Sequence, residues 1–487
     1  MGKYLKLFDT HADYQAFTQT SDFIKPNVSH CVNENDVHYN PWTWAEEYLT
    51  FVAKEDGTFT FTPRSSNVIS YSTDGGETWT EGNSVEVNSG DKVMWKGTMT
   101  PREYDGIGKF SSTGNFDVQG NAMSLLYGNK YKGQTDLTGK NFAFYSLFYG
   151  NTKVVNAENL SLPATTLAAY CYNNMFSGCA SLVTAPKLPA TTLASVCYDG
   201  MFNGCTSLVN APELPAETLA GSCYNSMFQG CTSLTTAPVL PATTLANYCY
   251  NNMFQGCTSL TTAPVLPATT LTQSCYSSMF SGCINLTTAP ELPATTLAKS
   301  CYSNMFYNTN IIPDCSNIDF TSETVVSSGG LSGLFGGTKI TDADLERILP
   351  KNTNGKYCLP VTTLAERCYS NMFQGCTSLT TAPELPATTL TSSCYSNMFR
   401  GCTSLTTAPE LLATTLTSGC YDNMFYGCTS LNYIKAMFTT TPSSSYTSSW
   451  VKSVSATGTF VKNSAATWNV TGNNGIPSGW TVETASA

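Results

Sequence analysis

Cysteine is the most reactive side chain that recurs in this sequence, and it recurs at a fixed spacing. Sixteen of the 20 cysteines form pairs eight residues apart within the pattern CYxxMFxGC. Structural zinc sites use cysteines that are closer together, with roughly two to four residues between them, so the spacing does not predict a metal. Disulfides belong to oxidising compartments, and we find no secretory signal peptide at the start of the sequence. We therefore expect reduced thiols that fill a tight interior.

Other residues that could support catalysis or bind a metal are few. His30, Cys31 and His38, with Glu34 and Asp36 nearby, are of types that bind metals, but their spacing matches no known site. Solvated polar residues explain this cluster equally well. The repeated part of the chain holds no histidine, so no Ser-His-Asp set is present there. We predict no catalytic residue, no cofactor and no metal site.

A single stretch, STDGGETW, resembles the Asp-box of sialidase-like propellers. Ser72, Asp74, Gly76 and Trp79 match its S-x-D-x-G-x-x-W pattern. In propellers the Asp-box is a structural hairpin that occurs once in each blade. Here it occurs once, and no array of blades surrounds it, so we expect a hairpin and no glycosidase activity.

A repeat of 26 residues organises most of the chain. One unit, residues 240–265, reads LPATTLANYCYNNMFQGCTSLTTAPV, and the Met of each Met-Phe pair marks the period: Met175, Met201, Met227, Met253, Met279, Met305, Met372, Met398 and Met424. A fixed period of this length is typical of a solenoid, in which each coil covers the apolar edge of the next. The four-residue spacing in CYNNMFQGC predicts a short helix, and SLTTAP predicts the strand that pairs between coils.

The segments around the repeats divide the chain further. We expect a polar leader over residues 1–42, a small antiparallel Ig-like β-sandwich over 43–130, and an N-terminal capping coil over 131–161. The repeats run over 162–438, with an irregular coil at 307–358 that holds the amphipathic run DADLERIL. Residues 439–487 lose the motif and supply the aromatic residues of a C-terminal cap.

Three sets of repeat positions are candidates for binding. The residue after Ala-Pro varies among Lys187, Glu213, Val239, Val265, Glu291, Glu384 and Glu410, which suits an exposed surface and not a catalytic pair. The residues just before each CYxxMF motif vary most. The third set is a tyrosine in every coil, which either packs inside or forms an aromatic ligand-binding strip: Tyr172, Tyr198, Tyr224, Tyr250, Tyr276, Tyr302, Tyr369, Tyr395 and Tyr421.

Composition narrows the range of partners. The net charge is −10 and charged residues make up only 12% of the chain, which argues against a nucleic-acid partner. The sequence contains no apolar stretch of spanning length, so we expect no membrane insertion. Thr, Ser, Asn and Gly replace charged residues, which predicts a neutral, polar surface.

The pattern MFxGCxSLxxAPxLPxxTLxxxCY resembles the BspA-like leucine-rich repeats of bacterial surface proteins, over residues 142–438. The resemblance implies a β-rich repeat protein, a right-handed solenoid of the leucine-rich-repeat type with short helices. It also implies a role in adhesion, with binding of proteins or glycans, and no catalytic residues.

The two ends resemble segments of proteins from gut Bacteroides and their phages, including crAss-like phages. The stretches YLKLFDTHADYQAF and GTFVKN…GIPSGWTV carry this resemblance. It implies a virion fibre or host-attachment protein that is assembled in the host cytoplasm. Such a protein joins other virion proteins through its N-terminal region and binds a host surface protein or glycan through its repeats. A bacterial surface adhesin is the alternative, a glycan-active enzyme is third, and homo-oligomerisation stays open.

Overall fold

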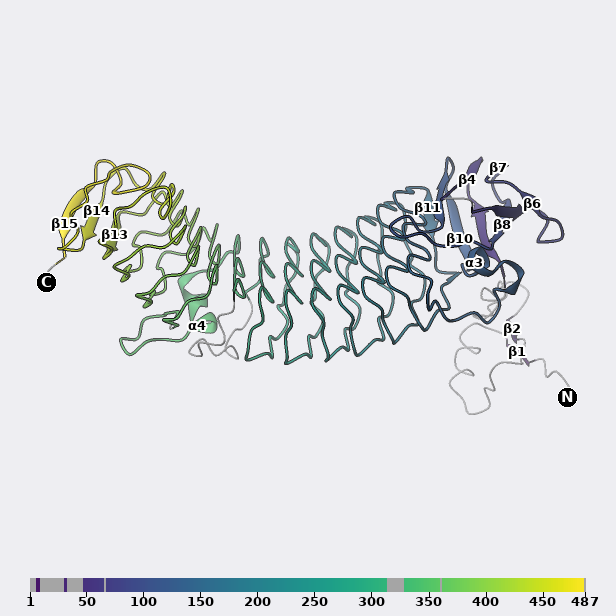
Figure 1. The fold of residues 1–487 in the computed structure, drawn as a ribbon, viewed down its shortest axis with the longest axis horizontal. Helices are drawn as coiled ribbons and strands as arrows, with labels where there is room; N and C mark the ends of the chain where they lie inside the picture. Colours follow the sequence, from purple (N-terminus) through teal and green to yellow (C-terminus); the bar gives the residue numbers. More distant parts are fainter. Residues whose placement is uncertain are drawn as a thin grey trace.

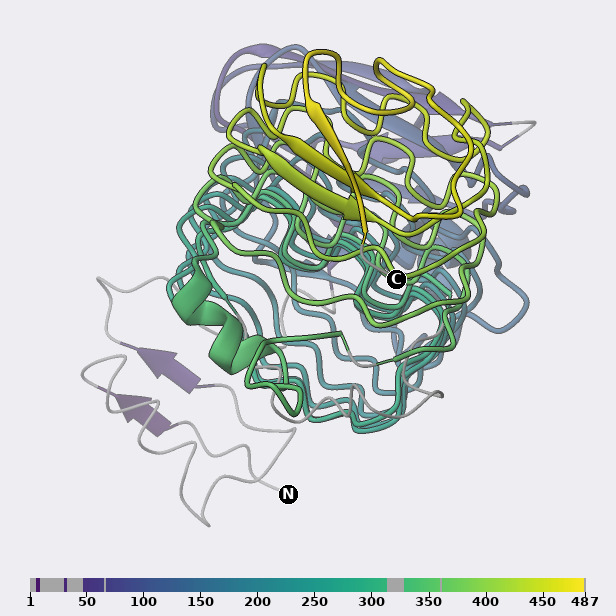
Figure 2. The same ribbon diagram turned by 90° about the vertical axis from the view of Figure 1, so that its left-hand side faces the viewer.

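The computed structural model describes residues 6–8, 30–32, 47–64, 67–312, 328–359 and 361–485. Figure 1 shows coils stacked side by side in a row, with sheets at both ends. The end-on view in Figure 2 shows the coils superimposed along the row, with helix α4 projecting from its side. The prediction of a β-rich chain is confirmed, and the described residues include only short helices, none of them in a regular coil. No helix in the described part of the chain has the length and hydropathy of a transmembrane span.

The N-terminal part contains two β-sheets that share an aromatic core. One has the order β11-β10-β3-β8-β5-β6, with β12 also paired to β10, and the other has the order β7-β4-β9. Phe51 of β3 contacts Phe59 of β4 and Phe110 of β9, with ring centroids 5.4 and 4.7 Å away. The strands are β3 Leu49–Ala53, β4 Gly57–Pro63, β5 Ile69–Ser72, β6 Thr80–Glu81, β7 Ser84–Val87, β8 Lys92–Gly97, β9 Gly108–Ser112, β10 Phe116–Asn121, β11 Val154–Asn156 and β12 Leu160–Ser161.

This sheet continues into the first coil. Most of its strands pair antiparallel, as the alternating sequence predicts, but β10 pairs in parallel with both β11 and β12. The sheet therefore crosses the predicted boundary at residue 130. Helix α3 (Ser124–Tyr127) and the 3₁₀ turn η1 (Gly128–Lys130) lie between the two parts. Short strands β1 (Lys6–Phe8) and β2 (His30–Val32) form a separate parallel pair.

The CYxxMFxGC segment of each regular coil is a series of β-turns, and the predicted helix in CYNNMFQGC is wrong. Alternate N–H groups close turns within the coil, as in Met253 N to Tyr250 O at 3.2 Å. The N–H groups between them donate to the next coil, as in Phe254 N to Met279 O at 3.0 Å. An α-helix would direct every N–H along its own axis, so it cannot make the second set of bonds. The four-residue spacing reflects two consecutive turns with the same orientation.

The strand predicted in SLTTAP is reduced to single bridges. Thr236 pairs in parallel with Asn210 on one side and Thr262 on the other. A second column of bridges joins some of the TTL segments, as between Thr218 and Thr244. Prolines in LPATTL and TTAP lack an N–H donor, which explains why the pairing does not extend into longer strands.

The second residue after the tyrosine is left-handed in each regular coil, and it is glycine, asparagine or serine. Asn252, two residues after the tyrosine, has φ = 55°, and Ser226 and Asn304 in other coils have 53° and 54°. These residue types tolerate positive φ better than others, and β-branched residues tolerate it worst. The YxxM spacing of the repeat therefore encodes a turn.

We expect Asn252→Val to lower the free energy of unfolding by about 1–2 kcal/mol, because valine is strained in the left-handed region. Asn252→Gly should stay within a few tenths of a kcal/mol of the native protein, roughly as at other left-handed positions. Guanidinium unfolding measures both. Asn251→Val is the matched control at a neighbouring site without positive φ, and an equal loss there would contradict the explanation.

The irregular coil and the C-terminal end depart from the repeat. The predicted amphipathic run contains η2 (Asp342–Asp344) and α4 (Leu345–Ile348). Thr341 caps η2 in a capping box with Asp344. At the C-terminal end, β13 (Tyr433–Ala436), β14 (Thr459–Lys462) and β15 (Thr481–Thr484) form a parallel sheet that covers the last coil.

Candidate functional site

The tyrosine column lies in the core, so the prediction that it forms a ligand-binding surface is wrong. All nine rings are 0–1% exposed. Neighbouring rings stack face to face, as between Tyr224 and Tyr250, with centroids 5.9 Å apart and planes 9° from parallel. Burial raises the pKa of Tyr198 and Tyr395 well above the ordinary value. The alternative, a packing ladder, is what the structure shows. The nine residues are Tyr172, Tyr198, Tyr224, Tyr250, Tyr276, Tyr302, Tyr369, Tyr395 and Tyr421.

The paired cysteines also lie in the core, as predicted. The second thiol of each pair donates to a main-chain carbonyl of the preceding coil, as in Cys257 Sγ to Phe228 O at 3.0 Å. Burial raises the pKa of Cys231 and Cys283 from 9.0 to about 12. Such a thiol stays protonated and is a poor nucleophile at neutral pH. These cysteines therefore serve packing.

The STDGGETW stretch forms a hairpin between β5 and β6. Asp74 accepts hydrogen bonds from Thr78 N at 3.0 Å and from Ser72 Oγ at 2.7 Å. A hydrogen bond from Thr78 Oγ1, together with those from Thr78 N and Ser72 Oγ, holds the pKa of the exposed Asp74 carboxyl well below its usual range. Trp79 Nε1 donates to Gly76 O at 3.1 Å, which closes the loop. All the polar groups of the motif are thus used in shaping the turn.

The metal-binding residue types near the N-terminus fall largely outside the part of the chain that the structure describes. Glu34, Asp36 and His38 fall outside the described residues, and for His30 and Cys31 only the backbone is described. Among the residues that the structure describes, no group of three or more His, Cys, Asp or Glu side chains could hold a metal. Of the variable residues before the CYxxMF motifs, Asn247, Tyr248 and Lys299 are exposed, whereas Ser274 is buried.

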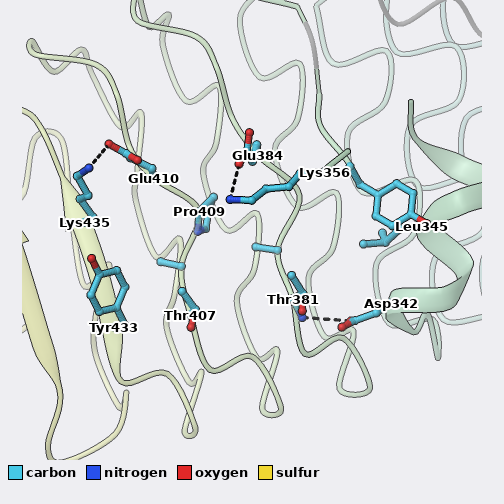
Figure 3. A pocket seen from close by; sticks show the side chains of 13 residues that line it. Asp342, Leu345, Lys356, Thr381, Glu384, Thr407, Pro409, Glu410, Tyr433 and Lys435 are labelled. Carbon is cyan, nitrogen blue, oxygen red and sulfur yellow. Dashed lines mark hydrogen bonds and ion pairs between the residues drawn. The ribbon is translucent and has the colours of Figure 1, made fainter. Parts of the chain in front are cut away.

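A groove of about 520 Å³ brings the irregular coil together with the variable column after Ala-Pro (Figure 3). Four lining residues come from the irregular coil, and the others come from the two repeat coils that follow it and from strand β13. Both features were expected to be exposed and variable, and the structure places them side by side. The lining residues are Asp342, Leu345, Lys356, Tyr357, Thr381, Ala382, Glu384, Thr407, Ala408, Pro409, Glu410, Tyr433 and Lys435.

Two ion pairs lie along this groove. Lys356 Nζ is 2.9 Å from Glu384 Oε1, and Lys435 Nζ is 2.6 Å from Glu410 Oε1. Asn352 Nδ2 also donates to Glu384 Oε2 at 2.6 Å. The hydrogen bond with Glu384 raises the pKa of Lys356. The groove thus presents paired charges of both signs, with Tyr357 and Tyr433 among its lining residues.

Asp342 attaches the irregular coil to the next regular one. Its carboxylate accepts hydrogen bonds from Thr380 N at 2.9 Å and Thr381 N at 3.1 Å. Burial alone raises the pKa of Asp342, but the hydrogen bonds from Thr380 and Thr381 outweigh it and lower the pKa overall. The carboxylate is therefore ionised at neutral pH and acts as an anchor.

Sequence reasoning missed Asp342, Lys356 and Lys435 as lining residues. Glu384 and Glu410 were visible as members of a variable column, and residues 307–358 as an interruption. The path of residues 307–358 decides which face of the next coil they lie against, and the sequence does not show this path. The pairing of Thr380 with Asp342 spans 38 residues, and no local pattern signals it.

Comparison with known families identifies the repeats. The model of the BspA type leucine rich repeat region matches residues 169–312, 249–329 and 361–465, with six copies, which together span more than half of the 487-residue chain. Searches of curated proteins and of solved structures give no match.

Proposed function

Because the chain belongs to the BspA type leucine-rich repeat family, we propose that it is a non-enzymatic protein that binds a host surface protein or glycan. The repeats indicate a recognition protein. In this proposal the stacked coils form a right-handed solenoid, and the Ig-like sandwich and the C-terminal cap close its two ends. The solenoid displays the groove beside the irregular coil to the ligand.

The observation that carries the proposal is the composition of this groove. The Leu, Cys, Tyr and Met-Phe positions that recur in the coils are buried, whereas the charged and aromatic residues of the groove, such as Lys356, Glu384 and Tyr433, stand at positions that change or occur once. Concave sites with a few placed polar groups are typical of ligand binding. Charges of both signs suit a polar ligand that exchanges hydrogen bonds with Glu384 and Lys356.

The same groups argue for binding over catalysis. General acid–base chemistry needs two groups whose pKa values are driven apart. In the groove, Glu384 and Glu410 are each paired with a lysine, and the pKa of Asp342 is lowered by hydrogen bonds that fix it in place. The glycan-active alternative would also need Asp74, whose oxygens are used within its own hairpin.

We place the protein on a phage virion, as a fibre or host-attachment component joined to other virion proteins through its N-terminal region. Support comes from the resemblance of the two ends to phage proteins. A cell-surface adhesin is the alternative, because its repeats would be the same. Mass spectrometry of purified virions and of cell envelopes distinguishes the two. Recovery from envelopes alone would overturn the virion assignment, and the native mass of the protein would show whether it forms a homo-oligomer.

The groove itself is tested by binding of the labelled protein to a panel of Bacteroides strains. We expect Glu384→Ala and Lys356→Ala to reduce cell binding by roughly tenfold or more, since each removes a charged contact and leaves its partner unpaired. Glu213→Ala is the matched control, because Glu213 occupies the same column outside the groove. Equal binding by all three variants and the native protein would contradict the assignment of this groove.

A further inference from the structure

A second column of side chains changes character along the row of coils. The residue before the glycine in MFxGC is a neutral amide in several regular coils, and these amides form a ladder. Asn203 Nδ2 donates to Gln229 Oε1 at 3.0 Å, and Gln229 Nε2 donates to Gln255 Oε1 at 2.7 Å. After the irregular coil, the same column holds Gln374, Arg400, Tyr426 and Lys452.

In this later part the amide ladder is replaced by cation–π contacts. The Arg400 guanidinium carbon lies 4.9 Å from the centre of the Tyr426 ring, and Lys452 Nζ lies 5.4 Å from it. The spacing is held by the backbone, because Gly375 N donates to Arg400 O and Gly401 N to Tyr426 O, both at 2.7 Å. Two cations thus lie against one aromatic ring, with Arg400 exposed and Tyr426 half-buried.

This column lines a second groove, of about 550 Å³, that shares no lining residue with the first. It crosses five consecutive coils. Tyr307 and Lys339 line it from the irregular region, Arg400 and Tyr426 from the later coils, and Gly337, Gly375, Gly401 and Gly427 along its length. The glycines carry no side chains, so the backbone is open to a ligand that runs along the row.

The groove is cationic in a protein whose net charge is −10. No lining residue carries a carboxylate. Within the described residues, Lys339, Arg400 and Lys452 take part in no ion pair. Cations that lack a partner carboxylate beside a half-exposed aromatic ring are the recognition chemistry for an anion attached to a flat, partly apolar body.

We propose that this groove binds an anionic saccharide, one that bears carboxylate or sulfate groups. Arg400 and Lys339 pair with the anionic groups, while Tyr307 packs against the face of a sugar ring and Tyr426 holds the Arg400 guanidinium in place. Gln374 and Thr377 offer an amide and a hydroxyl for sugar hydroxyls. A single-stranded nucleic acid uses similar contacts, but the net negative charge of the protein opposes a polyphosphate chain.

The site is independent of the groove at Glu384. A negative result for saccharide binding here can therefore be told apart from a negative result for the proposed function, which is tested by cell binding of the Glu384 and Lys356 variants. The probes are an oligogalacturonate, its neutral methyl ester and a heparin-derived oligosaccharide, with binding measured by calorimetry on the full chain. We expect the anionic probes to bind, with an affinity that falls as salt rises, and the ester to bind at least roughly tenfold more weakly. Whichever of the two anionic probes binds more tightly identifies carboxylate or sulfate as the preferred group.

The decisive variant is Arg400→Gln, because glutamine is the native residue at this position in other coils and keeps the fold. We expect it to weaken binding by roughly tenfold, with Arg400→Lys falling between, since lysine keeps the charge and loses the planar fork. Lys187→Gln removes an exposed cation elsewhere and should change nothing. No binding of either anionic probe, equal binding of the ester, equal binding of a single-stranded oligonucleotide, or an unaffected Arg400→Gln variant would each overturn the proposal.

Discussion

The protein should lose stability steeply above pH 9. It should unfold in a pH range in which most proteins without buried thiols stay folded. Burial raises the pKa of Cys197, Cys231 and Cys428 from 9.0 to about 12, and other core thiols shift in the same direction. Regular coils carry two such thiols each, so the effect is repeated along the row.

The sign follows from proton binding. Above pH 9 an unfolded thiol releases its proton, while the folded thiol keeps it until about pH 12. The stability contributed by the protonated core is complete below pH 9 and is lost as the pH rises toward 12. Each thiol lowers the free energy of unfolding by about 1.4 kcal/mol for every pH unit between its unfolded and folded pKa values. With two thiols in each regular coil, we expect the array to unfold well before pH 12.

Thermal unfolding followed by circular dichroism from pH 7 to 11 measures this loss. The double variant Cys231→Ala and Cys257→Ala separates the thiols from the buried tyrosines, whose pKa values are also raised. It should be less stable at pH 7, through lost packing, and show a shallower decline above pH 9. A melting temperature that stays constant to pH 11, or an unchanged slope in the double variant, would contradict the assignment.

The repeat itself could be predicted from the sequence, but the conformation of its coil could not. The period, the buried cysteines and the capping ends follow from apolar residues at fixed intervals. Cys249, Met253 and Cys257 share a four-residue spacing with helices, and periodicity alone does not distinguish a helix from a series of turns. The distinguishing signal is the Asn, Ser or Gly before each Met, as at Asn252, because a left-handed residue ends a helix.

The tyrosine column shows a similar limit. A residue that recurs in every coil is either packed or displayed, and tyrosine suits both because its ring is apolar and its hydroxyl is polar. The structure buries even the hydroxyl groups, and those of Tyr172 and Tyr276 have no hydrogen-bond partner. The cost of these unpaired hydroxyls is offset by stacking along the column, a gain that exists only once the coils are assembled. A single unit of sequence therefore could not reveal the direction of the rings.

The two grooves show what the sequence does not encode locally. Glu384 and Arg400 are each visible as departures from a column. The irregular region places Lys356 beside Glu384, and it places Tyr307 and Lys339 in the groove that Arg400 lines, although the aromatic partner of Arg400 is Tyr426 of a regular coil. The interruption therefore matters because it changes which side chains meet.

Phe254→Ala should cost about 3–5 kcal/mol of unfolding free energy, because the ring is fully buried at the middle of the phenylalanine column. It stacks on Phe228 and Phe280, with centroids 5.7 and 5.8 Å away, so its loss leaves a cavity between two coils. Coils contact only their neighbours, and the row has no other core to bridge the defect. We therefore expect the variant to unfold in two steps, because the coils before and after residue 254 then unfold at different denaturant concentrations.

Val265→Ala is the control for this experiment. Val265 is the last residue of the same repeat unit but is 79% exposed, so its truncation should change the free energy of unfolding by less than about 0.5 kcal/mol. Guanidinium unfolding followed by tryptophan fluorescence and by circular dichroism resolves the two steps. Trp95 lies in β8, Trp450 packs against Phe460 of β14, and these two strands lie at opposite ends of the row. If Phe254→Ala unfolded in one step with the stability of Val265→Ala, the stacked rings would not hold the coils together. Coincident signals with a large loss would instead mean that the row unfolds as one cooperative unit.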